Sequence, residues 1–346
     1  MRRVFFARAG ESDYGGAERY LARLREALKE LGYESEVLHS PIASFLPSWI
    51  RVPLYERYIC RMREKFAPGD ILFSLERVSC ADIYRAGDGV HRAFLEHKGF
   101  SLNPLHPILL HMERRCFENS SKIIANSRLV KREIVDCYGI DEDKIEVIYN
   151  GINIPESFDS ALARKRLSKE FSMKPGEKMI LFVGSGFERK GVAEFLEILS
   201  RLKGEYRAFV VGREKRMGRY LSMAKRLGIG GRVVFTGPRR DVELFYAAAD
   251  IFLFPTRYEP FSNVVLEAMS YATAVFTTSR NGASEILDDY FVMKEPLDSL
   301  VAEKIDRLLE DEESLLLAAR KARERASSFT IERNAKETLA LIGKVV

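Results

Sequence analysis

The sequence predicts an α/β protein with two doubly wound, Rossmann-like domains that face each other across a cleft. Short apolar runs alternate with longer amphipathic segments along the 346 residues, a pattern typical of parallel strands joined by right-handed helical crossovers. The alternation forms two consecutive series, separated by the sequence NIPESFD at 153–159. We therefore expect an N-terminal domain at 1–153 and a C-terminal domain at 154–327, with a C-terminal helix over about 328–346 that packs back on the first domain.

Each expected element follows from its pattern of apolar residues. VFFA at 4–7 has the length of a buried strand, whereas 16–31 places apolar residues on one helical face and is ended by Gly32. In the first series we expect strands at 4–7, 35–39, 71–74, 82–86, 122–127 and 144–152, and helices at 16–31, 104–119 and 128–138. In the second we expect strands at 179–186, 207–212, 232–237, 250–255 and 274–278, and helices at 191–203, 216–227, 241–248, 263–271 and from 298 onward.

Composition excludes several classes of protein. Hydrophobic residues make up 46% and charged residues 30%, as in a folded globular protein. The net charge of +5 is not gathered into a basic stripe, so no nucleic-acid partner is expected. The five histidines all fall in the first half in no metal-like array, and no metal site is expected.

The cysteines and the apolar runs indicate a cytoplasmic protein. Cys60, Cys80, Cys116 and Cys137 form no CxxC pair, so we expect four reduced thiols. The apolar run near the N-terminus is too short for a signal peptide. No apolar stretch approaches the roughly 18 residues of a transmembrane helix.

Ligands of open parallel sheets bind at the carboxyl ends of the strands, which directs attention to GSGFERKGV at 184–192. Arg189 and Lys190 stand directly before an expected helix, where cations oppose the helix dipole unless an anion lies between them. A diphosphate would satisfy the guanidinium, the ammonium and the helix together. The spacing is neither a Walker A loop nor a dinucleotide fingerprint, and a solvated basic turn is the structural alternative.

A second candidate segment is RYEPFSNVVLEAM at 257–269. Glu259 is expected in a loop after a strand, and Glu267 about one turn into the next helix, for which Ser262 or Asn263 is a suitable N-cap. Backbone N–H groups here are expected to bind phosphate, namely those of Phe261, Ser262, Asn263, Val264 and Val265. Two carboxylates alone would also fit a solvated face or a glycosidase pair. With phosphate-binding elements nearby, they favour a nucleotide-sugar, each glutamate binding the hydroxyls of one sugar.

A third segment, GGAER at 15–19, follows the first strand after a loop. Gly15 and Gly16 would let backbone N–H groups approach an anion or a sugar closely. The alternative is a glycine turn that helps helix packing and leaves Glu18 exposed.

Together these segments resemble the retaining family 4 glycosyltransferases of the GT-B fold. Glu259 to Glu267 is similar to the EX7E motif of that family. The supporting segments occur in family order: GGAER (15–19), GSGFERKGV (184–192), VVGR (210–213), FTGPRRDVELFYAAADIFLFPT (235–256) and RNGASEIL (280–287). DIYRAGDGVHRAFLEHKGF at 82–100 and GSGFERKG are most similar to members that add glucose to the lipopolysaccharide core. GGAERY departs from them, because Tyr20 follows where they carry an aspartate soon after the glycine pair.

The resemblance implies a role for each candidate residue. Arg189 and Lys190 would neutralise the diphosphate of a UDP-sugar without a metal or other cofactor, and Glu267 and Glu259 would bind the ribose and the transferred sugar. Asp88 or His91 would lie on the sugar or acceptor side. Further substrate-binding positions are Gly15, Gly16, Glu18, Gly184, Arg213 and Arg239, the two arginines near the base. Retention would proceed by front-face attack, with no enzymatic nucleophile.

The expected activity is transfer of a hexose, with glucose the expected sugar, from a UDP-sugar to a lipopolysaccharide core or similar cell-envelope glycan. Two alternatives stay open: another nucleotide-sugar with a polysaccharide or small-molecule acceptor, and a non-catalytic nucleotide-sugar-binding subunit. Residues 48–65 interleave Lys and Arg with Trp49, Tyr55 and Tyr58, which fits either a packed helix or a patch on the anionic inner face of the cell membrane.

Overall fold

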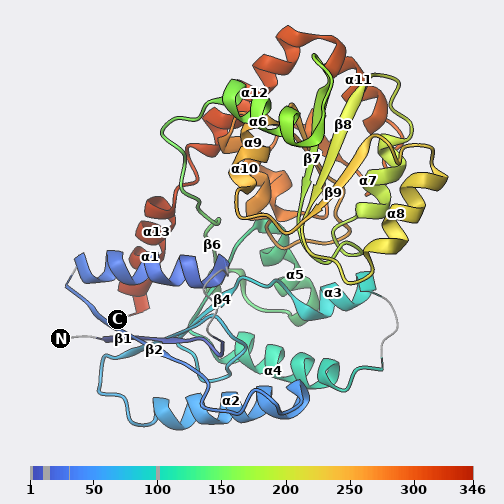
Figure 1. The fold of residues 1–346 in the computed structure, drawn as a ribbon. Helices are drawn as coiled ribbons and strands as arrows, with labels where there is room; N and C mark the ends of the chain where they lie inside the picture. The colour runs from blue at the N-terminus through green and yellow to red at the C-terminus, as the bar shows by residue number, and fades with distance from the viewer. Residues whose placement is uncertain (1–2, 11–15, 31, 99–101, 346) are drawn as a thin grey trace. The chain divides into compact units, whose positions relative to one another are not determined.

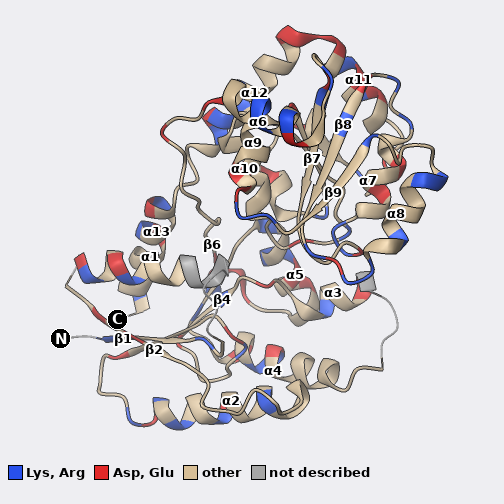
Figure 2. Cartoon of the chain, in the orientation of Figure 1, with Lys and Arg blue, Asp and Glu red and all other residues tan. Residues whose placement is uncertain are grey.

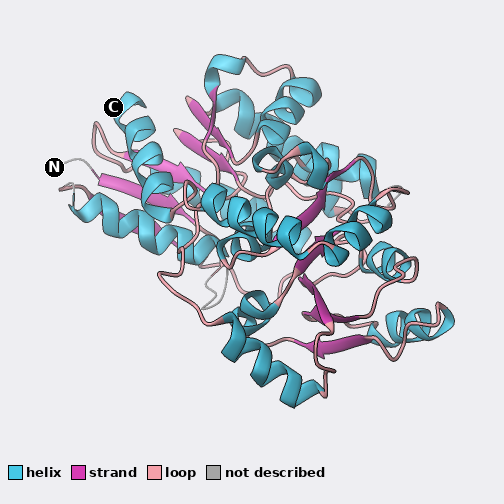
Figure 3. Cartoon of the chain, turned by 90° about the horizontal axis from the view of Figure 1, so that it is seen from above, coloured by secondary structure: helices cyan, strands magenta, loops and turns pink. Residues whose placement is uncertain are grey.

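A computed structural model describes residues 3–10, 16–30, 32–98 and 102–345. The chain divides into two compact units, called here the first unit (Met1–Gly151 with Ile331–Val346) and the second unit (Ile152–Thr330). Each unit contains one parallel six-stranded sheet with helices on its faces, as Figure 1 shows and Figure 3 shows from another direction. The predicted α/β class with two doubly wound domains is confirmed.

The sheet of the first unit has the order β2-β1-β3-β4-β5-β6, with all pairs parallel. Its strands are β1 (Arg3–Ala7), β2 (Glu34–Leu38), β3 (Ile71–Ser74), β4 (Ile83–Ala86), β5 (Lys122–Ala125) and β6 (Ile145–Val147). Its helices are α1 (Gly16–Glu30), α2 (Ser48–Arg63), α3 (His91–Lys98), α4 (Leu105–Asn119), α5 (Arg128–Tyr138), the short η1 (Glu142–Lys144) and α13 (Ile331–Val345).

Both faces of this sheet are buried, which explains why its strands are continuously apolar. On one face, Val4 and Phe6 of β1 pack in a cluster with residues of α1 and with Ala335, Leu341 and Ile342 of α13. On the other face, Phe5 packs with Tyr55 and Ile59 of α2. Helix α13 therefore belongs to the core of the first unit, although the whole second unit, Ile152–Thr330, separates it in sequence from the rest of that unit.

The sheet of the second unit has the order β12-β11-β10-β7-β8-β9, so β7 and β10 are neighbours in its centre. Its strands are β7 (Lys178–Val183), β8 (Tyr206–Val211), β9 (Val233–Gly237), β10 (Ile251–Phe254), β11 (Ala274–Thr278) and β12 (Val292–Met293). Its helices are α6 (Ser160–Phe171), α7 (Val192–Leu199), α8 (Met217–Arg226), α9 (Val242–Ala248), α10 (Asn263–Ser270), η2 (Gly282–Ile286), η3 (Asp289–Phe291), α11 (Val301–Glu310) and α12 (Glu312–Ala326).

The sequence missed helices α3 and α6, and it made the strand at 144–152 too long. In α6 only Ala163 and Leu167 are buried, so the charged remainder of the helix masks a short apolar stripe. The helix nevertheless has a strong start signal, because the Asp159 carboxylate accepts a hydrogen bond from the Leu162 N–H at 2.8 Å. Beyond β6 the chain leaves the sheet, and Ile152 forms only an isolated bridge with Thr330.

The expectation of four reduced thiols is wrong for two of them. Cys60 at the end of α2 and Cys80 in the loop before β4 form a disulfide, with Cα atoms 5.7 Å apart. Cys116 is buried and Cys137 partly buried, and both are free. The pairing depends on how α2 packs beside the β3–β4 loop, which sequence spacing does not reveal. The cytoplasmic location that rested on reduced thiols stays a prediction.

Charged residues of both signs are interspersed over each unit (Figure 2). This agrees with the absence of a basic stripe in the sequence. Among the described helices, none combines the length and apolar character needed to cross a bilayer.

Candidate functional site

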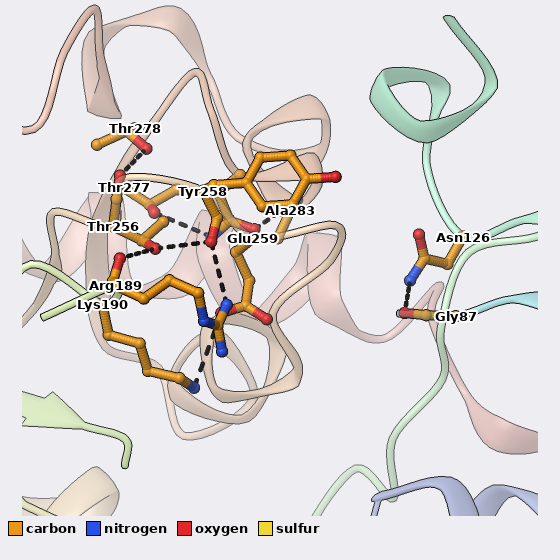
Figure 4. A network of polar contacts seen from close by, with 11 residues as sticks. Gly87, Asn126, Arg189, Lys190, Thr256, Tyr258, Glu259, Thr277, Thr278 and Ala283 are labelled. Atoms are coloured by element: carbon orange, nitrogen blue, oxygen red, sulfur yellow. Dashed lines mark hydrogen bonds and ion pairs between the residues drawn. The ribbon is translucent and has the colours of Figure 1, made fainter. Parts of the chain in front are cut away.

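The candidate site of the second unit lies where β7 and β10 end. These adjacent strands lead into the loops that carry Arg189 and Lys190 on one side and Glu259 on the other. Because both strands are parallel, their carboxyl ends meet at one edge of the sheet, where ligands of such sheets bind. The structure brings these three predicted residues together (Figure 4).

Arg189 and Lys190 share one carboxylate oxygen. Arg189 Nη1 donates to Glu259 Oε2 at 2.6 Å, and Lys190 Nζ lies 3.8 Å from the same atom. Arg189 Nη1 also donates to the Tyr258 carbonyl at 3.1 Å. The two cations therefore outnumber the carboxylate that they share, which leaves the cluster with an excess of positive charge for an anion.

Lys190 is the most buried cation of the cluster, with 15% of its side chain exposed. Its stem crosses Gly184, where an added Cβ would lie 2.7 Å from Lys190 Cδ, and its Nζ lies 5.4 Å from the centre of the Phe254 ring. Burial lowers the pKa of Lys190 below its ordinary value, and the neighbouring Glu259 carboxylate opposes this shift. Gly184 thus makes room for the lysine side chain, and its substrate-binding role stays a prediction.

The two loops are tied to each other through the backbone of Arg189. Its carbonyl accepts hydrogen bonds from the Arg257 N–H at 3.0 Å and from Thr256 Oγ1 at 3.1 Å. Gly191 follows with φ of +79°, and a Cβ at this position would lie 1.8 Å from the Pro255 carbonyl oxygen. Only glycine allows this close approach, so the start of α7 is held directly against the end of β10.

The Glu259 loop is also held from its other side by residues to which the sequence assigned no individual role. The Glu259 N–H donates to the Arg280 carbonyl, and the Gly282 N–H donates to the Glu259 carbonyl, both at 3.0 Å. Thr278 Oγ1 donates to the Thr256 carbonyl at 2.8 Å (Figure 4). Completely buried polar side chains hold this region, namely Thr256, Thr277, Thr278 and Asn281. Their signal in the sequence is a cluster of small polar residues at the end of an otherwise apolar strand.

Glu267 lies on α10, and its position is fixed by a tyrosine that the sequence did not single out. Tyr246 of α9 is 1% exposed and donates from its hydroxyl to Glu267 Oε2 at 2.9 Å. Tyr271 stacks on Tyr246, with ring centres 5.9 Å apart. A buried tyrosine that points its hydroxyl at a carboxylate restricts the rotamer of that carboxylate.

One predicted phosphate ligand at the start of α10, the Val265 N–H, has a partner within the helix, and its phosphate-binding role stays a prediction. The Val265 N–H donates to the Ser262 carbonyl at 3.2 Å, and it is therefore used inside the helix. Ser262 is the N-cap but makes no side-chain capping hydrogen bond. The positions of Phe261, Ser262, Asn263 and Val264 before and in the first turn agree with the predicted helix start, and their phosphate-binding role stays a prediction.

The two arginines predicted near the base differ in their surroundings. Arg213, directly after β8 and Gly212, is exposed, and its N–H donates to Ser185 Oγ at 3.0 Å. Arg239 forms ion pairs with Glu170 at 2.7 Å and with Asp241 at 2.8 Å. Arg239 is therefore committed to two carboxylates in this structure.

In the first unit, Asp88 and His91 follow β4, and Asp88 is exposed. His91 Nε2 lies 3.0 Å from His106 Nδ1. The backbone N–H of His91 donates to Glu113 Oε1 at 2.7 Å. Gly16 is the first residue of α1. Gly15 and the side chain of Glu18 lie outside the described residues.

Glu113 of α4 is a completely buried carboxylate that the sequence did not single out. It accepts from Arg77 Nε at 2.9 Å, from the Tyr138 hydroxyl at 2.6 Å and from the backbone N–H groups that start α3. Its negative charge caps the positive end of α3 and so fixes the turn that carries Asp88 and His91. Within the described part of the chain, no cluster of three or more His, Cys, Asp or Glu could hold a metal ion.

Comparison with known proteins supports the fold and the family. The glycosyl transferases group 1 model matches residues 163–326, and the glycosyltransferase family 4 model matches residues 76–155. An uncharacterised glycosyltransferase of Methanocaldococcus jannaschii is 33% identical over 211 residues, which are 58% of this chain and 54% of the relative. The lipopolysaccharide glucosyltransferase WaaG of Escherichia coli is 28% identical over 236 residues, 64% of this chain and 62% of the relative. The chain thus spans less than two thirds of the length of these relatives.

Solved structures cover more of the chain. A crystal structure of WaaG, a glycosyltransferase involved in lipopolysaccharide biosynthesis, superposes with a TM-score of 0.82 at 22% identity, over 98% of this chain and 99% of that one. Anabaena HepE in complex with UDP-glucose superposes with a TM-score of 0.77 at 18% identity, over 99% of both chains. These likenesses show the fold, which is GT-B. The two family models show that the chain contains a glycosyl transferases group 1 domain at 163–326 and a glycosyltransferase family 4 domain at 76–155.

Proposed function

We propose that this protein transfers a hexose, with glucose the preferred sugar, from a UDP-sugar to a lipopolysaccharide core or similar cell-envelope glycan, with retention of configuration and without a metal. The observation that carries the proposal is the cluster of Arg189, Lys190 and Glu259 at the carboxyl ends of β7 and β10. It supplies two cations for a diphosphate and one carboxylate for sugar hydroxyls within two loops that are hydrogen-bonded to each other.

Binding of the donor would redistribute the charges of this cluster. In this structure Glu259 is the counter-charge of both cations. A diphosphate carries more negative charge and offers bidentate geometry to Arg189, so it would replace Glu259 as their partner. Glu259 would then be released to accept hydrogen bonds from hydroxyls of the transferred sugar.

Glu267 would bind the ribose of the nucleotide. Its carboxylate is oriented by the Tyr246 hydroxyl, and a carboxylate accepts well from the paired hydroxyls of a sugar. The solved complex of Anabaena HepE with UDP-glucose, whose chain has the same fold, supports UDP-glucose as the first donor to test.

The transfer step needs mainly stabilisation of the leaving group. The bond between the anomeric carbon and the phosphate oxygen breaks, and the acceptor oxygen forms its new bond on the same face of the sugar. The acceptor proton passes to the leaving phosphate oxygen, so neither an enzymatic nucleophile nor a general base is needed. Arg189 and Lys190, already positioned, stabilise the negative charge that develops on the diphosphate.

The first unit would bind the acceptor, with Asp88 and His91 held in place by Glu113. A lipid-linked acceptor would also place this unit near a membrane, and α2 and its preceding loop have suitable residues. Phe45, Trp49 and Leu54 are 85%, 45% and 40% exposed, and Arg57 and Arg61 of the same helix are exposed. Sedimentation with vesicles of anionic and of neutral lipid tests this surface. The unmodified protein should sediment with the anionic vesicles and not with the neutral ones, and Trp49→Ser combined with Arg57→Glu should abolish that binding. Failure of the unmodified protein to sediment with the anionic vesicles would contradict it.

The proposed activity is tested by calorimetry with a panel of nucleotide-sugars and by transfer to purified core acceptors. We expect UDP-glucose to bind most tightly, and Lys190→Ala and Arg189→Ala to reduce transfer by about a hundredfold to a thousandfold. Arg257→Ala is a matched control, because Arg257 lies in the same pair of loops but its side chain pairs with Glu194 at 2.6 Å. Transfer at near-normal rates by both cluster variants would contradict the proposal. UDP binding without transfer to any acceptor would favour a non-catalytic subunit.

A further inference from the structure

Arg85, near the end of β4 in the first unit, is a buried cation that none of the proposed roles uses. It is 8% exposed, and its strand position places it at the carboxyl edge of the sheet, two residues before the turn that carries Asp88. A charge is rarely buried to this extent unless it is paired, because removing it from water is unfavourable.

Two contacts hold the guanidinium in place without neutralising it, and a glycine leaves room for it. Nη2 donates to Asn150 Oδ1 at 2.7 Å, and Cζ lies 4.1 Å from the centre of the Tyr20 ring. At Gly87, an added Cβ would lie 2.3 Å from Arg85 Nη1, so the missing side chain leaves room for the guanidinium. The guanidinium is thus surrounded by segments that are far apart in the sequence, namely α1, β4 and the loop after β6.

The guanidinium lacks acceptors for part of its donors. Nε is buried and has no hydrogen-bond partner, and within the described residues no carboxylate lies at ion-pair distance from Arg85. Other arginines of the same unit differ in this respect. Arg77 pairs with Glu113 at 2.9 Å, and Arg63 pairs with Asp82 at 3.0 Å. Arg85 is therefore held in place with an uncompensated charge.

We propose that Arg85 is the centre of an oxyanion site in the first unit, and that it binds a phosphate group of a substrate. A guanidinium presents a planar set of donors that suits phosphate, and an arginine fixed in advance loses little side-chain entropy on binding. Because the site lies at the carboxyl edge of the sheet, it is suited to a substrate rather than to a structural ion. The inference deepens the proposed function and rests on it only for the identity of the substrate. The phosphate belongs either to the acceptor or to the donor diphosphate.

The first test is thermal unfolding of variants with inorganic phosphate as the probe, at constant ionic strength. The starting protein carries Lys190→Ala, which weakens phosphate binding by the second unit. Phosphate should raise its Tm, and adding Arg85→Met should remove this rise. Arg63→Met is the matched control, because it removes an arginine of the same unit whose charge is already paired, and it should retain the rise. Arg85→Lys keeps the positive charge but loses the planar set of guanidinium donors, so phosphate should raise its Tm by a smaller amount.

Stability without phosphate separates a binding role from a purely structural one. If Arg85 is an uncompensated buried charge, Arg85→Met should unfold at a Tm equal to or above that of the parent protein. If Arg85 only holds α1 to β4 and the loop after β6, Arg85→Met should have a lower Tm than the parent protein. Phosphate should then change the Tm of both proteins equally. That pair of results would overturn the proposal.

Titration of Arg85→Met with UDP, with Lys190 intact, identifies the source of the phosphate. A loss of UDP affinity of about tenfold or more would assign the site to the donor diphosphate. Unchanged UDP affinity would assign it to a phosphate on the acceptor, and the acceptor KM should then rise by a similar factor. If Lys190→Ala leaves UDP binding intact, the proposed donor site is wrong. The Tm rise with phosphate, and its loss in Arg85→Met, still test the Arg85 site independently.

Discussion

The cations of the second unit and Arg85 of the first unit are prepared for anions in opposite ways. Arg189 and Lys190 share the Glu259 carboxylate, so their charge is partly neutralised before any ligand arrives. Arg85 is held by an amide oxygen and an aromatic ring, neither of which carries a negative charge. The first arrangement stores a carboxylate that a ligand must displace, and the second leaves a charge that a ligand would compensate. Variants that remove one charged or positioning group at a time therefore test these two arrangements separately.

The largest effect is expected from Glu259→Gln, which removes the stored carboxylate but keeps its shape. Transfer should fall about a hundredfold or more, because the hydroxyls of the transferred sugar lose their charged acceptor. UDP should bind as tightly as before or more tightly, because no carboxylate competes with the diphosphate for Arg189 and Lys190. Calorimetry with UDP and initial rates of transfer measure the two quantities. Loss of UDP affinity would show that Glu259 is not a competing counter-charge.

The next effect concerns stability and only the first unit, because all four cysteines lie there. Reduction of Cys60–Cys80, which closes a loop of 20 residues, should lower the free energy of unfolding of that unit by about 3 kcal/mol. Urea unfolding with and without reductant measures this, and a Cys60→Ser, Cys80→Ser variant should not respond to reductant.

Thiol titration provides the control for the disulfide. Burial raises the pKa of the Cys116 thiol to about 12 and that of Cys137 to about 11, so both should react slowly in the folded protein. The unfolded, unreduced protein should expose two thiols, and four would contradict the disulfide.

A smaller effect is expected from Tyr246→Phe, which removes the hydroxyl that orients Glu267. The KM for the donor should rise about tenfold with little change in kcat, since the carboxylate remains but is less restrained. Tyr206→Phe is the matched control, because Tyr206 is equally buried in the same unit and its hydroxyl donates to the Leu199 carbonyl. Equal effects of the two substitutions would indicate a general loss of stability rather than a role in donor binding.

The smallest effect is a pH dependence that should distinguish lysine from arginine. Burial lowers the pKa of Lys190 below 10.5, and only the protonated ammonium attracts a diphosphate. UDP affinity should therefore be fully present at neutral pH and fall as the pH rises through the lowered pKa. In Lys190→Arg the decline should disappear, because a guanidinium stays protonated. A decline of equal size in both proteins would assign the titration to another group.

The sequence predicted most of the fold and the core of the second-unit site. Strands such as β3 and β11 were located to the residue, because apolar runs between polar segments follow directly from burial on both sheet faces. Arg189, Lys190 and Glu259 were each expected after a parallel strand, and the structure shows that the two strands, β7 and β10, are neighbours. Helices α3 and α6 were missed because they are short or mostly charged.

What the sequence by itself determined was the class of fold, the alternation that makes two parallel sheets, and the strand ends at which charged residues gather. These are local properties, because the spacing of apolar residues and the residues that end a helix or strand lie within a short stretch of sequence. Only the tertiary structure decided that Cys60 meets Cys80, that Tyr246 orients Glu267 and that Glu113 caps α3. It alone shows Arg85 seated between Tyr20 and Asn150 without a described carboxylate. Each of these contacts joins residues 20 or more positions apart, so it depends on the path of the backbone rather than on any pattern along the chain.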